Sequence, residues 1–89
     1  MEVYKINFAP RIKEARKRTG FTQKEVSEET GIQQSKLSKY ENGDLEPNLE
    51  TLGKLAEFYG VSTDWLLGIT LQGARPNYDQ VSMQQKKAM

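Results

Sequence analysis

The stretch GIQQSKLSKYENG, residues 31–43, carries hydrogen-bonding side chains at spacings that favour one side of a helix. At about 100° per residue, five of these side chains fall within about 140° of arc: Gln34, Ser35, Ser38, Lys39 and Asn42. A Gln amide matches the N6 and N7 edge of adenine, Ser pairs with several base edges, and Lys reaches guanine or phosphate. This face is therefore suited to the major groove of a duplex, although most polar helix faces are only solvated.

The two adjacent glutamines of this stretch face different directions, because helical neighbours diverge by about 100°. Gln34 lies on the polar face, whereas Gln33 turns toward the helix start or the protein body. A helix over residues 34–42 is about 12 to 14 Å long, close to the roughly 12 Å width of the major groove. We expect Tyr40 to be a core residue, because its angle places it beside Leu37 on the other side of the helix.

The helix that would carry this face is one of five short helices that the sequence predicts. Each is followed by a glycine, the residue that most readily takes the left-handed conformation beyond a helix end: Gly20, Gly31, Gly43, Gly60 and Gly68. Four helices begin after a side chain that can accept a bond from a free amide of the first turn: Asn7, Thr22, Asn48 and Ser62. Glu25 can also return a bond to the Thr22 backbone, which would complete a capping box.

Apolar residues at steps of three and four support the same division. In the fourth helix they are Leu49, Leu52, Leu55, Ala56 and Tyr59, which predict one buried stripe. Trp65 lies in the apolar end of the fifth helix, and we expect it in the core. Strand signals are minor: Tyr4, Ile6 and Phe8 alternate, and the β-tolerant segment GITL leaves a short pairing of the two ends open. The pattern as a whole predicts an all-α fold.

Composition limits the classes of function. The 89 residues, 28% of them charged, suit one small domain. The chain has no Cys and no His, so we expect no enzyme, no metal site and no cofactor. No apolar run approaches the roughly 20 residues that cross a bilayer, so we expect a cytoplasmic protein without a membrane partner. The net charge of +1 hides a gradient, because residues 1–43 hold nine basic and six acidic residues.

The span from Phe8 to Gly68 resembles the Cro and phage-repressor helix-turn-helix family, also known as the XRE family. The first half of the family pattern has Thr-Gln, a small residue within a helix, and Gly with a branched apolar residue in the turn, here Thr22, Gln23, Ser27, Gly31 and Ile32. The second half has Glu-Asn-Gly, Pro, Leu-Glu-Thr-Leu and Gly-Val-Ser, here residues 41–43, 47, 49–52 and 60–62. This ordered set is far more specific than any one of its parts.

The resemblance implies a compact five-helix repressor-like DNA-binding domain, with the helix-turn-helix at the second and third helices. It implies base reading by Gln34, Ser35 and Lys39, with Ser38 beside them. It implies contacts with the DNA backbone by Gln23, Asn42 and Lys36, and free amides at Thr22 and Gln23 would suit a phosphate oxygen. It also implies a structural ion pair between Arg16 and Glu41. One departure is Gln33, which stands where family members carry Ser or Thr as the third-helix cap.

We therefore expect an N-terminal arm over residues 1–7, a helix-turn-helix domain over residues 8–68, and a polar tail over residues 69–89. The tail is either disordered or a helix that packs on a partner chain. The implied function is a transcriptional regulator, a repressor, that binds double-stranded DNA as a homodimer on an inverted repeat. The alternative is an antitoxin-like or other protein-interaction module with secondary DNA binding. An exposed Trp65, or an ordered tail docked on another protein, would favour that alternative.

Overall fold

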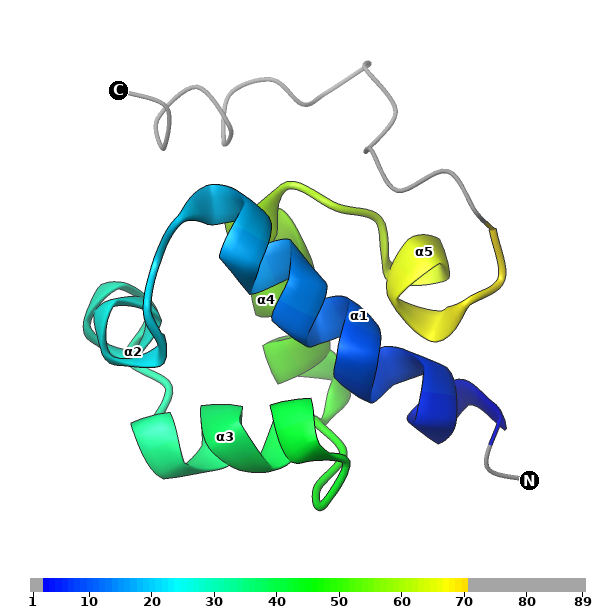
Figure 1. Cartoon of the computed structure of the whole chain (residues 1–89), viewed down its shortest axis with the longest axis horizontal. Coiled ribbons are helices and arrows are strands. Elements are labelled where there is room, and N and C mark those ends of the chain that lie inside the picture. Colours follow the sequence, from blue (N-terminus) through cyan, green and yellow to red (C-terminus); the bar gives the residue numbers. More distant parts are fainter. Residues whose placement is uncertain (1–2, 71–89) are drawn as a thin grey trace.

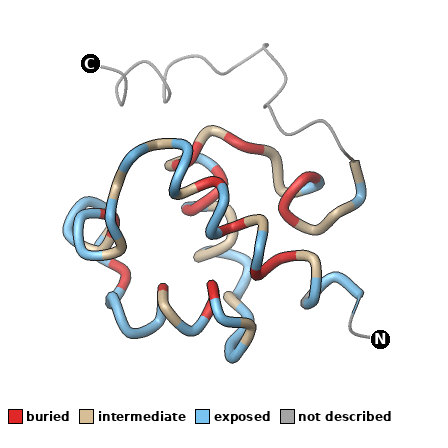
Figure 2. Tube along the Cα trace, in the orientation of Figure 1, coloured by how far each residue is buried: buried red, intermediate tan, exposed pale blue. Residues whose placement is uncertain are grey.

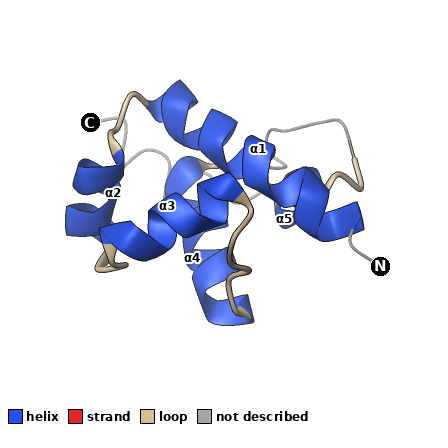
Figure 3. Cartoon of the chain, turned by 60° about the horizontal axis from the view of Figure 1, so that its bottom comes forward, coloured by secondary structure: helices blue, strands red, loops and turns tan. Residues whose placement is uncertain are grey.

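The computed structural model describes residues 3–70, which form five helices joined by short turns (Figure 1). The helices are α1 Val3–Thr19, α2 Gln23–Thr30, α3 Gln34–Asn42, α4 Leu49–Tyr59 and α5 Thr63–Leu67. Within this part of the chain all of the elements are helices (Figure 3), so the predicted all-α class is confirmed. Apart from Ile69 and Thr70, the predicted polar tail lies outside the described residues.

The ends of the helices follow local sequence signals. The predicted caps Thr22, Asn48 and Ser62 are confirmed, because each side-chain oxygen accepts a bond from the backbone N–H three residues on, at 2.8 to 3.1 Å. The Thr22 N–H donates in return to Glu25 Oε1 at 2.9 Å, which completes the capping box. All five predicted end glycines have φ between +75° and +85°. Gln33 precedes α3 without a side-chain cap bond.

The start of the first helix differs from the prediction. α1 begins at Val3, so Asn7 lies inside it and the prediction that Asn7 caps the helix is wrong. Asn7 Nδ2 instead donates to the Leu67 carbonyl at 3.2 Å and ties α1 to the end of α5. The alternative of a strand at residues 4–8 is also wrong, because Tyr4, Phe8 and Ile12 repeat at the four-residue step of a helix. Residues 3–7, assigned to an arm, are therefore helical.

The core takes one fully buried aliphatic side chain from every helix: Ile12, Val26, Leu37, Leu55 and Leu66. Tyr40 and Trp65 are buried around them, as predicted. Leu49 is the exception, because 85% of its surface is exposed and its predicted burial is wrong. It is the first residue of α4, one turn before Leu52, the residue at which that helix begins to pack on the core.

α1 is the central element of the fold. It contacts α3, α4 and α5, whereas α2 packs on α3 at one end of the molecule (Figure 1). Where α1 meets α5, the guanidinium carbons of Arg11 and Arg18 of α1 lie 5.4 and 5.1 Å from the centre of the buried Trp65 ring of α5. This arrangement leaves the long side of α3 that faces away from α1 uncovered. Among residues 3–70, none of the helices is both long enough and apolar enough to span a membrane.

Candidate nucleic-acid interface

The turn between α2 and α3 sets the direction of α3. Gly31 has φ of +82°, and its N–H donates to the Ser27 carbonyl at 2.8 Å, which closes α2. The Thr30 hydroxyl then accepts a bond from the Ile32 N–H at 3.2 Å, and the Ile32 side chain is buried. A residue with a Cβ is disfavoured at a positive φ. The glycine therefore lets α3 turn across α2 as a helix-turn-helix.

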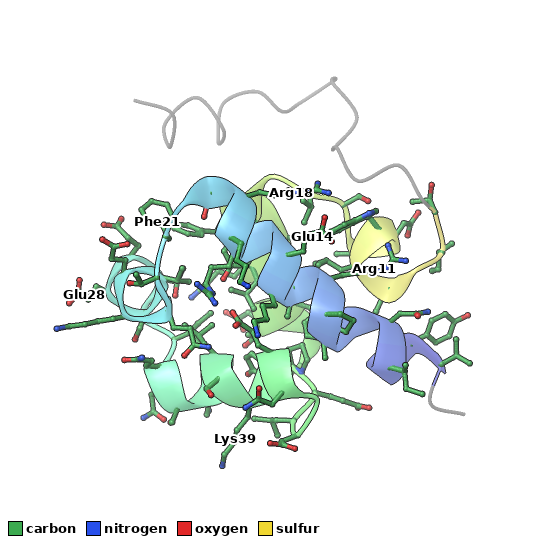
Figure 4. All side chains as sticks on the ribbon, viewed as in Figure 1. Arg11, Glu14, Arg18, Phe21, Glu28 and Lys39 are labelled. Carbon is green, nitrogen blue, oxygen red and sulfur yellow. The ribbon has the colours of Figure 1, made fainter. Side chains whose placement is uncertain are left out.

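The outer side of α3 is polar and exposed. Gln34, Ser35 and Lys39 are exposed, and Ser38 is half-buried among them. Figure 2 shows this side of the helix as exposed, and in Figure 4 Lys39 extends away from the rest of the molecule. Hydrogen-bonding groups on this side can therefore meet base edges without any displacement of the core.

The inner side of α3 is held in place by packing and by a buried ion pair. Leu37 and Tyr40 are 2% and 4% exposed. Arg16 Nε and Nη2 contact Glu41 Oε2 and Oε1 at 2.7 and 3.0 Å, which is the pair that the resemblance implies. The hydrogen bond to Glu41 raises the pKa of Arg16, against the effect of burial. A two-pronged pair of this kind fixes orientation as well as distance.

Gln23 also forms a hydrogen bond with Glu41, which was not predicted from the sequence. Its Nε2 donates to Glu41 Oε1 at 3.0 Å, so the first residue of α2 is tied to the last turn of α3. The two residues are 18 positions apart and share no local motif. One hydrogen of the Gln23 amide is used in this bond, and the other stays available for a phosphate oxygen.

The N-terminus of α2 offers donors, although fewer than expected. The Thr22 N–H is engaged by the Glu25 carboxylate, so the Thr22 backbone amide is not free. The Thr22 hydroxyl accepts a bond from Glu25 and keeps its own hydrogen to donate. The backbone N–H groups of Gln23 and Lys24 lie in the first turn, where no carbonyl inside the helix can reach them. An anion is stabilised at such a position by these groups and by the helix dipole.

Lys36 and Asn42 complete the set that the sequence predicts, and both are exposed. We call these residues the polar surface of α2 and α3: Thr22, Gln23, Gln34, Ser35, Lys36, Ser38, Lys39 and Asn42. It is bounded by acidic side chains just beyond α3, at Asp44 and Glu46. In the part of the chain that is described, no cluster of three or more His, Cys, Asp or Glu side chains could hold a metal ion.

Comparison with known proteins finds relatives for this region. Over 63 residues the chain is 46% identical to the HTH-type transcriptional regulator ImmR of Bacillus subtilis (strain 168), an overlap of 71% of this chain and 50% of that protein. Over 60 residues it is 43% identical to the SPbeta prophage-derived uncharacterized HTH-type transcriptional regulator YonR of the same strain, with coverages of 67% and 56%. Over 54 residues it is 39% identical to the cryptic phage CTXphi transcriptional repressor RstR of Vibrio cholerae, with coverages of 61% and 49%.

These overlaps span about half the length of the curated relatives that the chain matches. A family model described as "Helix-turn-helix" matches residues 12–66, more than half of the chain. The matched span holds the C-terminal part of α1 from residue 12 onward, the whole of α2, α3 and α4, and most of α5. It therefore includes the Gly31 turn and the polar surface of α2 and α3. This chain belongs to the helix-turn-helix family.

Proposed function

We propose that the chain is a sequence-specific DNA-binding transcriptional repressor that acts in the cytoplasm. The observation that carries this proposal is the geometry of α3, with Gln34, Ser35 and Lys39 exposed on one side and the other side fixed in the core. The names of two relatives support the same function, a transcriptional regulator and a phage transcriptional repressor. The matched family is one of helix-turn-helix proteins, which gives no support to an enzyme.

In this proposal the two helices divide the work. α3 enters the major groove and its polar side chains contact base edges, while the α2 N-terminus meets the sugar-phosphate backbone. Gln23, Lys36 and Asn42 supply the backbone contacts, and these fix the register of α3 without reading sequence. The ion pair between Arg16 of α1 and Glu41 holds α3 against α1, and the bond from Gln23 to Glu41 holds α2 against α3.

The chain is proposed to act as a homodimer on an inverted repeat. One short helix contacts only a few base pairs, whereas a useful operator must be preferred by about 4 to 10 kcal/mol over other sequences. Two copies related by a two-fold axis double the number of bases read, and their half-sites are spaced by about one helical turn of DNA.

Selection of bound duplexes from a random pool tests this function. The expected result is enrichment of one short half-site in two inverted copies, with centres about 10 base pairs apart. Sedimentation with the selected duplex should then give two chains per duplex. Enrichment of a single unrepeated site would contradict the homodimer, and a pool without enrichment would contradict sequence-specific binding.

The alternative is a protein-interaction module with secondary DNA binding. Trp65 gives it no support, because the residue is 5% exposed and its ring lies against the guanidinium groups of Arg11 and Arg18. The other surface considered for that function is the tail, which lies outside the described residues. A gel shift with random duplex at low and moderate salt separates the two functions, since phosphate contacts make affinity fall steeply with salt.

A further inference from the structure

An apolar groove lies outside the polar surface of α2 and α3. It is formed by the first turns of α1, the end of α3, the segment between α3 and α4, α4 itself and the end of α5, and its volume is about 280 Å³. Tyr4, Leu45, Leu52 and Leu67 supply its apolar wall from four different parts of the chain. Figure 1 shows the start of α1, the connection between α3 and α4, and α5 on the side of the molecule where the chain begins.

The groove continues into exposed apolar surface. Tyr4 is 55% exposed and Leu49 is 85% exposed. Leu49 precedes the groove residue Leu52 by three positions, so the two side chains lie on the same side of α4. Such a surface, apolar and rimmed by charge, is typical of a site that binds another segment of protein.

The negative charge beside the groove limits the kinds of molecule or segment that can bind in it. Residues 44–50 hold three acidic residues, Asp44, Glu46 and Glu50, and no basic residue. Glu46 is the one charged side chain among the described residues that line the groove. A DNA backbone would be repelled here. A symmetric contact with a second copy would bring the same acidic segments together, and like charges in an interface cost several kcal/mol.

Residues 71–89 of the same chain have the complementary chemistry. They hold three basic residues, Arg75, Lys86 and Lys87, against the single acidic residue Asp79. Between the basic positions lie Tyr78, Val81 and Met83, the apolar side chains of the middle of this segment. An apolar centre flanked by positive charge matches an apolar groove flanked by negative charge.

The connection is short enough for this segment to reach the groove. Leu67 lines the groove, and the described chain continues only to Thr70. The eight residues that follow Thr70, up to Tyr78, span about 26 to 29 Å when extended. A segment tethered so closely has an effective concentration of about millimolar, so even a weak site is occupied.

From these observations we propose that residues 75–87 dock in the groove formed by Tyr4, Leu45, Leu52 and Leu67 of their own chain. Tyr78, Val81 or Met83 fills the apolar wall, and Arg75, Lys86 and Lys87 face the acidic residues 44–50. The docked segment covers apolar surface next to the end of α3. This goes beyond the proposed DNA binding and does not depend on it.

Paramagnetic broadening in the full chain, without DNA, tests the proposal. The chain has no cysteine, so Ser82→Cys accepts a single nitroxide label. The amide signals of Leu45, Leu52 and Leu67 are expected to be weaker than the same signals recorded after the nitroxide has been reduced. The amide of Glu28 on α2, at the far end of the molecule in Figure 4, is the internal reference that keeps its intensity. Unchanged signals at the groove would overturn the proposal.

Two matched variants and a mixed sample complete the test. Glu46→Lys is expected to restore the groove signals, whereas Glu28→Lys, the same charge change at an exposed position of α2, should leave them broadened. Fluorescence of the single tryptophan, Trp65, verifies the fold of both variants. In the mixed sample, chains that carry the NMR isotope but no nitroxide are combined with chains that carry the nitroxide but no isotope. Broadening in that mixture would show the segment docked on a second copy, and broadening that survives Glu46→Lys would exclude the charge match. Either result overturns the proposal and leaves the proposed function untouched.

Discussion

Gln23 Nε2 and Glu41 Oε1 are joined by a hydrogen bond of 3.0 Å that links the first turn of α2 to the last turn of α3. Glu41 also binds Arg16 of α1 through both carboxylate oxygens. One buried carboxylate therefore connects three helices, including both helices of the helix-turn-helix. Because Gln23 is bonded to α3, the helix that also carries Gln34, a contact between Gln23 and a DNA phosphate would directly position the polar face of α3.

Truncation of Gln34 tests base reading. We expect Gln34→Ala to weaken binding to the selected operator by about 1 to 3 kcal/mol and to relax the choice of base at one position per half-site. The measurement is titration of the operator and of its single-base variants at one salt concentration. Gln33→Ala is the matched control, since Gln33 is an adjacent exposed glutamine without a cap bond, and it should leave base preference unchanged. Equal losses on all duplexes would show that Gln34 does not read sequence.

Truncation of Gln23 tests the backbone contact. Gln23→Ala is expected to weaken binding by about 1 to 3 kcal/mol on operator and non-operator duplexes alike, because a phosphate contact carries no sequence information. Titrations of both duplexes measure the loss, and Gln34→Ala gives the contrasting, sequence-dependent pattern. Full affinity after Gln23→Ala would restrict Gln23 to its structural bond with Glu41.

Neutralisation of Glu41 tests the buried connection. The Glu41 side chain is 3% exposed and that of Arg16 is 13% exposed, so Glu41→Gln is expected to reduce the free energy of unfolding by about 3 kcal/mol, because the partly buried Arg16 cation loses its charged partner. Urea unfolding with an unchanged m-value measures the difference. Glu14→Gln, which removes the exposed partner of Arg18, is the matched control and should change stability by less than about 0.5 kcal/mol. Similar effects of the two variants would argue against a structural role for the buried pair.

The pH dependence of stability at high pH should depend on Tyr59. Burial raises the pKa of this phenol above its ordinary value of 10.0, Glu41 raises it further, and Arg16 opposes them. The unfolded chain therefore releases this proton first as the pH rises, so the stabilisation is complete below about pH 10 and is lost above it. Tyr59→Phe should show a smaller loss of stability than the parent chain when urea unfolding is compared between about pH 9 and 11.

Tyr59→Phe also has an expected effect at neutral pH. The Tyr59 hydroxyl has no hydrogen-bond partner among residues 3–70, so its removal should leave stability unchanged or raise it by up to about 1 kcal/mol. Tyr4→Phe, the same change at an exposed position, is the control for stability at neutral pH. A clear loss of stability in Tyr59→Phe at neutral pH would indicate that the hydroxyl makes a stabilising bond.

Much of the fold could be predicted because its signals are local. A cap and the amide it accepts are three residues apart, as for Thr22 and Glu25, and a glycine such as Gly31 specifies a positive φ at its own position. The end of α3 at Gly43 follows from such a signal, and the outward direction of Gln34 follows from the helical period. The predicted start of α1 is wrong because Asn7 has the chemistry of a cap, whereas its side chain donates to the Leu67 carbonyl 60 positions away.

The sequence by itself determined five helices, all of their C-terminal ends and the polar face of α3, because bonds between near neighbours and the helical period decide these features. Only the tertiary structure decided which distant side chains meet. The bond between Gln23 and Glu41, the engagement of Asn7 by α5 and the exposure of Leu49 at the start of α4 are all of this kind. The physical reason is that such contacts depend on how the helices pack in space. The Gln23 and Asn7 bonds join residues far apart in the chain, and Leu49 is exposed although it fits the apolar period of α4.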